Sequence, residues 1–215
     1  MKKILYSLLI IVFFFQNGFC QEYTFDRYYE FNSINGISFF MINSSDNSYV
    51  FRGSSNGNGM RGSIFDFKTD VFHHYNVTNI DNAVNFEYSD SRKLQEAYPD
   101  AIEKKVQFEY IITKIDSVKE SVKIVKYKRK RKILGEVELI YSKNNSDYVF
   151  HNSALLFLSH HFYDKREIKN VNSRLPTSIQ FTFNNKKMAK TTLIKKQKIN
   201  TLLSITKEQL KYPYN

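Results

Sequence analysis

Hydrophobic and polar residues alternate along much of the chain. The alternation has a period of two, as in a β-strand, where successive side chains point to opposite faces. Most of the apolar positions hold β-branched or aromatic residues, which are typical of half-buried strands. They are Phe25, Tyr29 and Phe31; Val106, Phe108, Tyr110 and Ile112; Val122 and Ile124; Val137, Leu139 and Tyr141; and Ile179, Phe181 and Phe183. These segments predict antiparallel strands with one face on a core.

Clusters of Asn, Ser, Asp and Gly separate the alternating segments and predict turns. They occupy residues 32–36, 43–48, 53–62, 143–147 and 183–187. Residues 62–77 predict a hairpin that turns at residues 68–70. One side of this hairpin is expected to carry Phe65, Phe67, Val71, His73, Tyr75 and Val77. The whole pattern predicts a mainly β fold, a single antiparallel meander sheet or half-open barrel of about nine to eleven strands with one or two short helices.

Two stretches have the pattern of the short helices. Residues 90–105 begin with Asp90 as a helix cap and hold good helix formers before Pro99. Residues 152–167 begin with Asn152 as a cap and could bury one helical face. Periodicity does not distinguish a helix from a buried strand in the second stretch, so both interpretations stay open.

The first twenty residues have the composition of a signal peptide. Two lysines precede a mostly apolar run over residues 4–15, and Gly18 and Cys20 fit a cleavage site. The run is shorter than the roughly 20 residues of a spanning helix. We expect an exported protein, periplasmic, outer-membrane associated or secreted, whose mature chain begins at Gln21. Alternatively, Cys20 is retained and carries a lipid.

The mature chain is expected to be one domain without covalent cross-links. Cys20 is the only cysteine, so disulfides, cysteine-bound zinc and a thiol nucleophile are excluded after it. A chain of about 195 residues is long enough to bury one core. No linker or internal repeat divides it. We therefore predict a signal peptide over 1–20 and a single β-rich domain over 21–215.

The chain is basic, with 32 Lys and Arg residues against 21 Asp and Glu residues. Without the two lysines of the leader the net charge is about +9, which favours solubility and attraction to anionic envelope surfaces or lipids. Six basic residues lie close together in the sequence, and we call them the basic run: Lys126, Lys128, Arg129, Lys130, Arg131 and Lys132.

The basic run lies between two alternating segments and predicts the connection of a hairpin. Pairing of the two arms would bring Lys123 or Lys126 near Glu136 or Glu138. Nucleic-acid binding normally adds several interleaved aromatic rings, and only Tyr127 lies inside the run. We interpret the run as an exposed tip that contacts anionic surfaces, and expect no specific nucleic-acid partner.

The chain shows no recognisable metal site or catalytic motif. His73 and His74 are neighbours, as are His160 and His161, and neighbours in a strand point to opposite faces. Neither pair can therefore chelate one ion while its backbone is extended, and a shared site would need one histidine from each pair together with His151 or Asp70. Core or surface histidines are the favoured interpretation, and we expect no metal and no cofactor. The motifs of zinc proteases and of serine hydrolases are absent. We expect a protein without enzymatic activity.

The order of several segments resembles exported β-rich proteins of Bacteroidetes-type bacteria. These segments are the leader, "YTFDRYYEF", "NSSDNSYVF", "IFDFKTDVFHHYNV" and "LPTSIQFTF". More remotely, the pattern is similar to the curved half-barrel of periplasmic lipoprotein carriers. The resemblance implies a β protein of the cell envelope and supplies no catalytic residues.

Three functions remain open from the sequence. The first is a noncatalytic binding or structural role in the envelope. The second is a carrier of a lipid or acylated protein in an aromatic-lined concave sheet, and the third is a hydrolase without a recognisable motif. A carrier requires an open cavity, on the order of several hundred Å³, that aromatic residues line, whereas a closed core leaves no room for a ligand. The residues that distinguish the first two are Phe25, Phe65, Phe67, Phe108, Tyr110, Phe181 and Phe183.

Overall fold

The protein is mainly β. The computed structural model describes residues 21–56, 59–80, 83–93, 107–128, 132–142, 175–183, 186–206 and 208–210. Its strands are β1 (Gln21–Ser33), β2 (Gly36–Ile42), β3 (Tyr49–Asn56), β4 (Gly59–Asp66), β5 (Val71–Ile80), β6 (Ala83–Lys93), β7 (Gln107–Lys114), β8 (Lys119–Lys128), β9 (Lys132–Ser142), β10 (Pro176–Phe183) and β11 (Lys186–Ile205). Within these ranges no helix is found, and so none long and apolar enough to cross a membrane.

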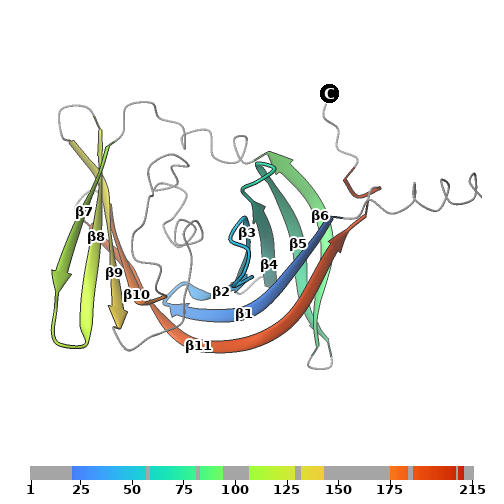
Figure 1. Cartoon of the computed structure of the whole chain (residues 1–215), viewed down its shortest axis with the longest axis horizontal. Coiled ribbons are helices and arrows are strands. Elements are labelled where there is room, and N and C mark those ends of the chain that lie inside the picture. The colour runs from blue at the N-terminus through green and yellow to red at the C-terminus, as the bar shows by residue number, and fades with distance from the viewer. Residues whose placement is uncertain are drawn as a thin grey trace, which may run out of the picture.

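All eleven strands belong to one antiparallel sheet. Its order is β6-β5-β4-β3-β2-β1-β11-β10-β9-β8-β7. The sheet therefore consists of two meanders, β1 to β6 and β7 to β11, joined where the first strand pairs with the last. Figure 1 shows β7 to β10 on one side, β3 to β6 on the other, and the long curved β1 and β11 between them. The predicted single antiparallel sheet is confirmed, but β6 and β7 are its two edges and do not continue one meander.

The alternating segments form the strands that they predict. In β8, Val122 and Ile124 are buried, and in β9 the same holds for Val137, Leu139 and Tyr141. Cross-strand partners share a face, and Ile124 is paired with Val137. One apolar face therefore continues from strand to strand, as a period of two requires.

The sheet has two cores, which lie on opposite faces of β2. Phe40 and Ile42 belong to one cluster of buried residues and Phe39 and Met41 to the other. The first core contains Tyr29, Phe31, Phe40, Ile42, Val50, Phe65, Phe72, Val122, Ile124, Val137, Leu139, Tyr141, Leu175 and Ile179. The second core contains Tyr23, Phe25, Phe39, Met41, Tyr49, Phe51, Ile64, Tyr75, Val77, Leu203 and Ile205. Strands that are buried on both faces need apolar residues at odd and even positions.

The hairpin of residues 62–77 is confirmed, but its predicted sides are wrong. β4 and β5 are joined by residues 67–70, and Asp70 has φ 63°. Phe65 is paired with Phe72 and lies in the first core, whereas Tyr75 lies in the second. Both arms are covered on both faces, so alternation within each arm could not show which residues share a side.

Three other local predictions need correction. Most of residues 53–62 lies in β3 and β4, so the turn is shorter than the run of small residues. Asp90 is not a helix cap, because β6 continues to Lys93 and pairs with β5. Ile112 is 69% exposed, since β7 is an edge strand. The remainder of the helix predicted over 90–105, all of 152–167 and the leader lie outside the described residues.

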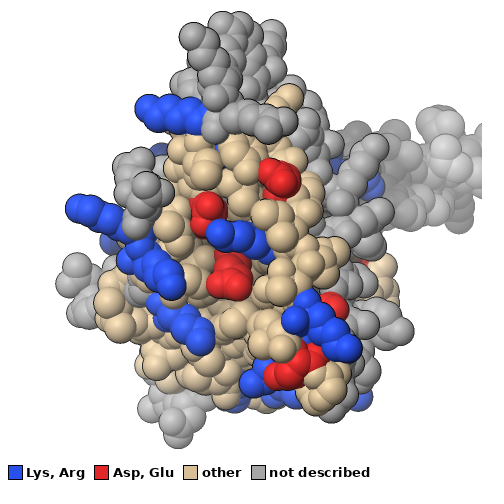
Figure 2. All heavy atoms as spheres, turned by 90° about the vertical axis from the view of Figure 1, so that its left-hand side faces the viewer, with Lys and Arg blue, Asp and Glu red and all other residues tan. Residues whose placement is uncertain are grey.

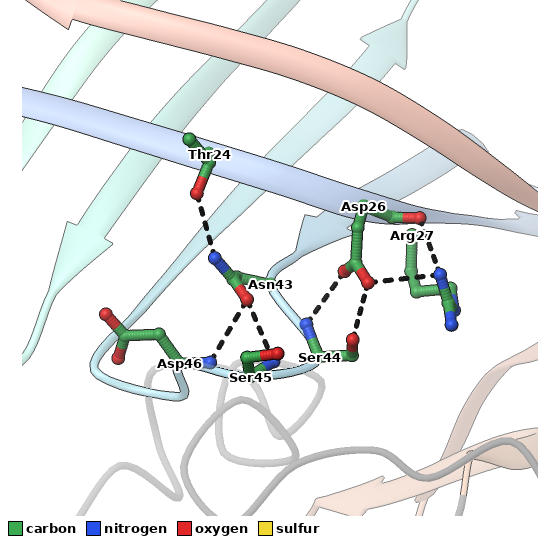
Figure 3. A network of polar contacts seen from close by, with 7 residues as sticks. All are labelled: Thr24, Asp26, Arg27, Asn43, Ser44, Ser45 and Asp46. Carbon is green, nitrogen blue, oxygen red and sulfur yellow. Dashed lines mark hydrogen bonds and ion pairs between the residues drawn. The ribbon is translucent and has the colours of Figure 1, made fainter.

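The predicted turn at residues 43–48 is confirmed and is bound to β1 (Figure 3). Asn43 Oδ1 accepts hydrogen bonds from two backbone N–H groups that follow it, at 2.8 and 3.1 Å, and Asn43 Nδ2 donates to Thr24 Oγ1 at 2.9 Å. Asp26 accepts hydrogen bonds from the backbone and hydroxyl of Ser44. The polar side chains therefore order the loop itself and need no ligand to explain them.

Candidate functional site

The aromatic residues expected to distinguish a closed core from an open surface divide into three groups. Phe25 is buried in the second core and Phe65 in the first. The other five are half-buried and pack against the first core from its margin. We call these five the aromatic rim: Phe67, Phe108, Tyr110, Phe181 and Phe183.

The aromatic rim is largely a property of β7 and β10. Phe108 and Tyr110 project from β7 toward the side of the sheet that carries the first core, and Phe181 and Phe183 do so from β10. The rings of Phe181 and Phe183 are stacked, with centroids 6.3 Å apart and planes at 8°. These rings neither fill one closed core nor stand fully in water. Part of the apolar surface around the first core therefore remains accessible.

A polar cavity of about 500 Å³ lies over β3 to β6. Its charged and polar lining includes Arg52, Ser54, Arg61, Ser63, His74, Asn76, Ser89, Asp90 and Arg92. Phe65 lines the cavity and also belongs to the first core. We call this cavity the arginine pocket. It borders the first core on the same side of the sheet.

Two copies of the tripeptide Arg-Gly-Ser form the centre of the arginine pocket. They are residues 52–54 in β3 and 61–63 in β4. Gly53 is the cross-strand partner of Gly62, so Arg52 lies opposite Ser63 and the second arginine, Arg61, opposite the first serine. Antiparallel pairing of two identical tripeptides produces a local twofold arrangement, with an arginine and a serine on each side of the glycine pair.

The glycines have a packing role on the opposite face. A Cβ atom on Gly53 would overlap the ring of Phe39, and one on Gly62 would overlap the ring of Phe51. Both rings are buried in the second core and stack on each other with centroids 5.8 Å apart. The tripeptides thus face arginine and serine toward the pocket and give the aromatic rings space behind it.

A chain of polar contacts crosses the pocket from β4 to β6. Ser63 Oγ is 2.8 Å from His74 Nδ1, and His74 Nε2 is 3.9 Å from Asp90 Oδ1. Arg92 Nη2 donates to Asp90 Oδ2 at 3.4 Å. Burial lowers the pKa of His74; the nearby Asp90 carboxylate opposes this shift and Arg92 adds to it. A neutral imidazole could accept the hydroxyl proton of Ser63, but at 3.9 Å Asp90 makes no hydrogen bond that would orient the ring, as a catalytic triad requires.

The other histidine of the pair lies in a buried polar chain on the opposite face. Tyr23 OH donates to Asp66 Oδ2 at 2.9 Å and is 2.9 Å from His73 Nε2. His73 Nδ1 is 2.5 Å from Ser91 Oγ. His73 is 1% exposed, and burial lowers its pKa to about 4 against the opposing effect of the Asp66 carboxylate. The prediction that the two histidines face opposite sides is confirmed, and His73 is neutral at pH 7.

The chain of polar contacts continues from Ser91 through Tyr88 to the backbone of Gln209. Tyr88 OH is 2.7 Å from Ser91 Oγ and donates to the backbone carbonyl of Gln209 at 2.9 Å. Both ends of the chain, a carboxylate and a carbonyl, are acceptors, and the four groups between them bring one proton each while His73 is neutral. Those four protons serve five short contacts. A second proton on His73 would complete the chain, in opposition to the effect of burial.

The basic run lies where a hairpin connection was expected. Lys126 and Lys128 belong to β8, Lys132 begins β9, and Lys128 is paired with Lys132. Arg129, Lys130 and Arg131 lie outside the described residues. The flanking strands are antiparallel, as predicted. Of its described residues, none of Lys126, Lys128 and Lys132 lines the arginine pocket.

The predicted ion pair between the hairpin arms is confirmed. Lys123 Nζ is 2.8 Å from Glu136 Oε2. Both residues line a smaller cavity of about 240 Å³ together with Glu138 and Lys187. Figure 2 looks onto this side of the molecule and shows carboxylates interspersed with the more numerous basic side chains. The two signs of charge are thus mixed here, and exposed pairs of this kind contribute about 1 kcal/mol or less to stability.

Replacing Arg129, Lys130, Arg131 and Lys132 with serine is expected to leave the melting temperature nearly unchanged, because exposed substitutions usually alter stability by within about 0.5 kcal/mol. The same variant should bind anionic vesicles more weakly in a cosedimentation assay. Binding by the unchanged protein should decrease as salt shortens the electrostatic range to about 8 Å near 0.15 M. A large loss of stability, or salt-insensitive binding to one oligonucleotide sequence, would contradict this interpretation.

The arginines of the pocket were missed by sequence reasoning. The repeated Arg-Gly-Ser is the signal that could have found them, but it overlaps the run of small residues over 53–62 that predicts a turn. Among the described residues no three His, Cys, Asp or Glu side chains are grouped so that they could hold a metal ion.

Comparison with known proteins does not add to this description. No model of a protein family matches the chain, and no curated protein is found to be related to it.

Proposed function

We propose that the protein is a noncatalytic binding protein of the cell envelope, and that it holds an apolar chain, a lipid or the acyl group of a protein, against the aromatic rim. The observation that carries this proposal is the half-buried state of the five rim residues around the first core. Aromatic side chains contribute large apolar areas to binding surfaces. A rim of this kind leaves apolar area that a ligand can remove from water.

The alternative of a purely structural protein with one closed core has less support. A closed core would bury the rim residues as completely as Phe31 or Val137, which are 0% exposed. The rim residues are instead the margin of a core whose centre is fully buried. Ligand sites are lined predominantly by apolar and aromatic side chains, and the half-buried rim residues supply side chains of this kind.

A position in the envelope is supported by the leader. The two lysines, the apolar run over residues 4–15 and the small residues near Cys20 are the features by which an export machinery recognises a chain. A carrier of acyl chains would have a use in a compartment between two membranes. The cleaved and the acylated form of Cys20 both agree with the proposal.

The proposal is tested with protein purified from its own cells. Native mass spectrometry is expected to show a population with the added mass of a lipid, which organic extraction removes. The extracted protein should then bind the neutral apolar probe N-phenylnaphthylamine. We expect the double substitution Phe181→Ala and Phe183→Ala to weaken binding of the probe about tenfold or more, since aromatic anchors dominate such surfaces.

Phe86→Ala is the matched control. Phe86 is also half-buried but packs against the second core, on the other face of the sheet. Its replacement should change probe binding less than about twofold, because it is not part of the binding surface. A clean apo mass together with equal binding by all variants would refute the proposal.

A further inference from the structure

The arginine pocket has an excess of positive charge. Arg52, Arg61 and Arg92 line it, and among the residues that the structure describes Asp90 is the one carboxylate of the lining. Arg92 already contacts Asp90 at 3.4 Å. With His74 neutral, these described lining residues together carry a net charge of about +2. Such a pocket attracts anions and disfavours cations.

The hydrogen-bonding groups of the pocket are chiefly donors. A guanidinium presents a planar fork of N–H groups that matches two oxygens of one anion. Ser54 and Asn76 add donors from hydroxyl and amide groups on the same side of the sheet. An anion with several oxygens and two charges would use this set more fully than a single carboxylate.

We infer that the arginine pocket is a binding site for a phosphate dianion, as the free ion or as the phosphomonoester headgroup of an amphiphile. A phosphomonoester carries a charge of about −1.5 to −2 at pH 7, which equals the excess charge of the lining. The volume of about 500 Å³ leaves room for the group to which the phosphate is attached. The inference does not depend on the apolar ligand proposed above.

The two tripeptides prepare the site before an anion arrives. Arg52 and Arg61 are held by strands in the interior of the sheet, and the glycine pair between them is pressed against buried aromatic rings. A rigid support lowers the ordering cost of binding. Because Phe65 belongs to both the pocket and the first core, an amphiphile could place its headgroup here and its chain along the apolar face.

Isothermal titration calorimetry at low salt tests the site with two probes, inorganic phosphate and dihexanoyl phosphatidic acid, and with dihexanoylglycerol as the uncharged reference. Binding of phosphate alone identifies the free ion as a ligand. Binding of the phosphatidic acid without binding of free phosphate or of the uncharged lipid identifies a headgroup. If neither phosphate compound binds, the inference is overturned.

Two variants separate a specific site from general attraction. Arg52→Gln combined with Arg61→Gln should weaken phosphate binding about tenfold or more, because hydrogen bonds to charged groups are worth more than neutral ones. The control removes two charges elsewhere, with Lys190→Gln and Lys198→Gln on the exposed side of β11, and should change binding less than about threefold. Equal losses in both variants would overturn the inference.

Three further measurements keep the test decisive. Arg61 is exposed, so Arg61→Gln alone should weaken binding in a folded protein even if the double variant is unstable. In the unchanged protein, NMR titration should show that phosphate raises the pKa of His74, since a nearby anion favours the imidazolium. The Phe181→Ala and Phe183→Ala variant should keep its phosphate affinity, which separates failure of this inference from failure of the apolar site. If the pKa of His74 is unchanged at saturating phosphate, the inference of a phosphate site is contradicted.

Discussion

Replacing Gly62 with alanine is expected to lower the free energy of unfolding by about 1 to 3 kcal/mol, the usual range for overpacking a core. The added Cβ would overlap the ring of Phe51, which is 0% exposed. That ring contacts Phe39 and Phe86 with centroids 5.8 and 5.3 Å away, so it has little freedom to move aside. Gly53→Ala should have a similar effect through Phe39. Urea denaturation followed by circular dichroism measures both changes.

Ser54→Ala is the matched control for the glycine substitutions. Ser54 is exposed and adjoins Gly53 in the same strand, so its replacement should change stability by within about 0.5 kcal/mol. A second control replaces the ring with a smaller side chain. Phe51→Leu should lower the free energy of unfolding less in the Gly62→Ala protein than in the unchanged one, because the two positions share one space. Gly62→Ala as stable as the parent would show that the rings do not require the glycines.

Acidification is expected to destabilise the protein well before its carboxylates are protonated. The pKa of His73 is lowered from 6.5 to about 4 in the folded state, so the unfolded chain binds the proton more readily. The contribution of His73 is therefore fully present above pH 6.5 and is lost as the pH falls toward 4. It amounts to about 3 kcal/mol over the whole range and to about 2 kcal/mol between pH 7 and pH 5.

His73→Gln should remove most of the decrease between pH 7 and pH 5, whatever its effect on stability at pH 7. His74→Gln is the comparison, because His74 is half-buried and lies beside His73 on the opposite face. The charged groups that act on His73 are Asp66 and His74. A protein that gains stability on acidification would refute the lowered pKa. It would mean that a second proton on His73, which completes the hydrogen bonds between Asp66 and Gln209, stabilises the fold by more than burial of the charged imidazolium costs.

The candidate site could be predicted from the sequence only in part. The rim residues were identified as inward-facing aromatics from their alternation, and four of the five lie in the strands β7 and β10. Their half-buried state was not predictable, because it depends on where each strand lies in the sheet. The arginine pocket was missed altogether. Arg52 and Arg61 are ordinary polar positions along each strand and become a site only when Gly53 pairs with Gly62.

The buried chain around His73 shows the same limit. Tyr23 and His73 are 50 residues apart, and Tyr88 and Gln209 are 121 residues apart. Nothing near His73 in the sequence indicates whether it faces a carboxylate, a serine or water. The direction of its pKa shift follows from burial, and burial follows from the packing of distant strands. Sequence reasoning could state only that His73 and His74 face opposite sides.

The sequence by itself determined local properties of this protein: the strands β1, β4, β5 and β7 to β10, several of the turns, the inward faces of β8 to β10 and the pairing of Lys123 with an acidic residue across the hairpin. These follow from a period of two and from turn chemistry, which act over a few residues. The tertiary structure decided that β1 pairs with β11, that β6 and β7 are the edges, and that β2 is buried on both faces. Register and long-range pairing depend on contacts between residues far apart in the chain, and alternation within one strand carries no information about them.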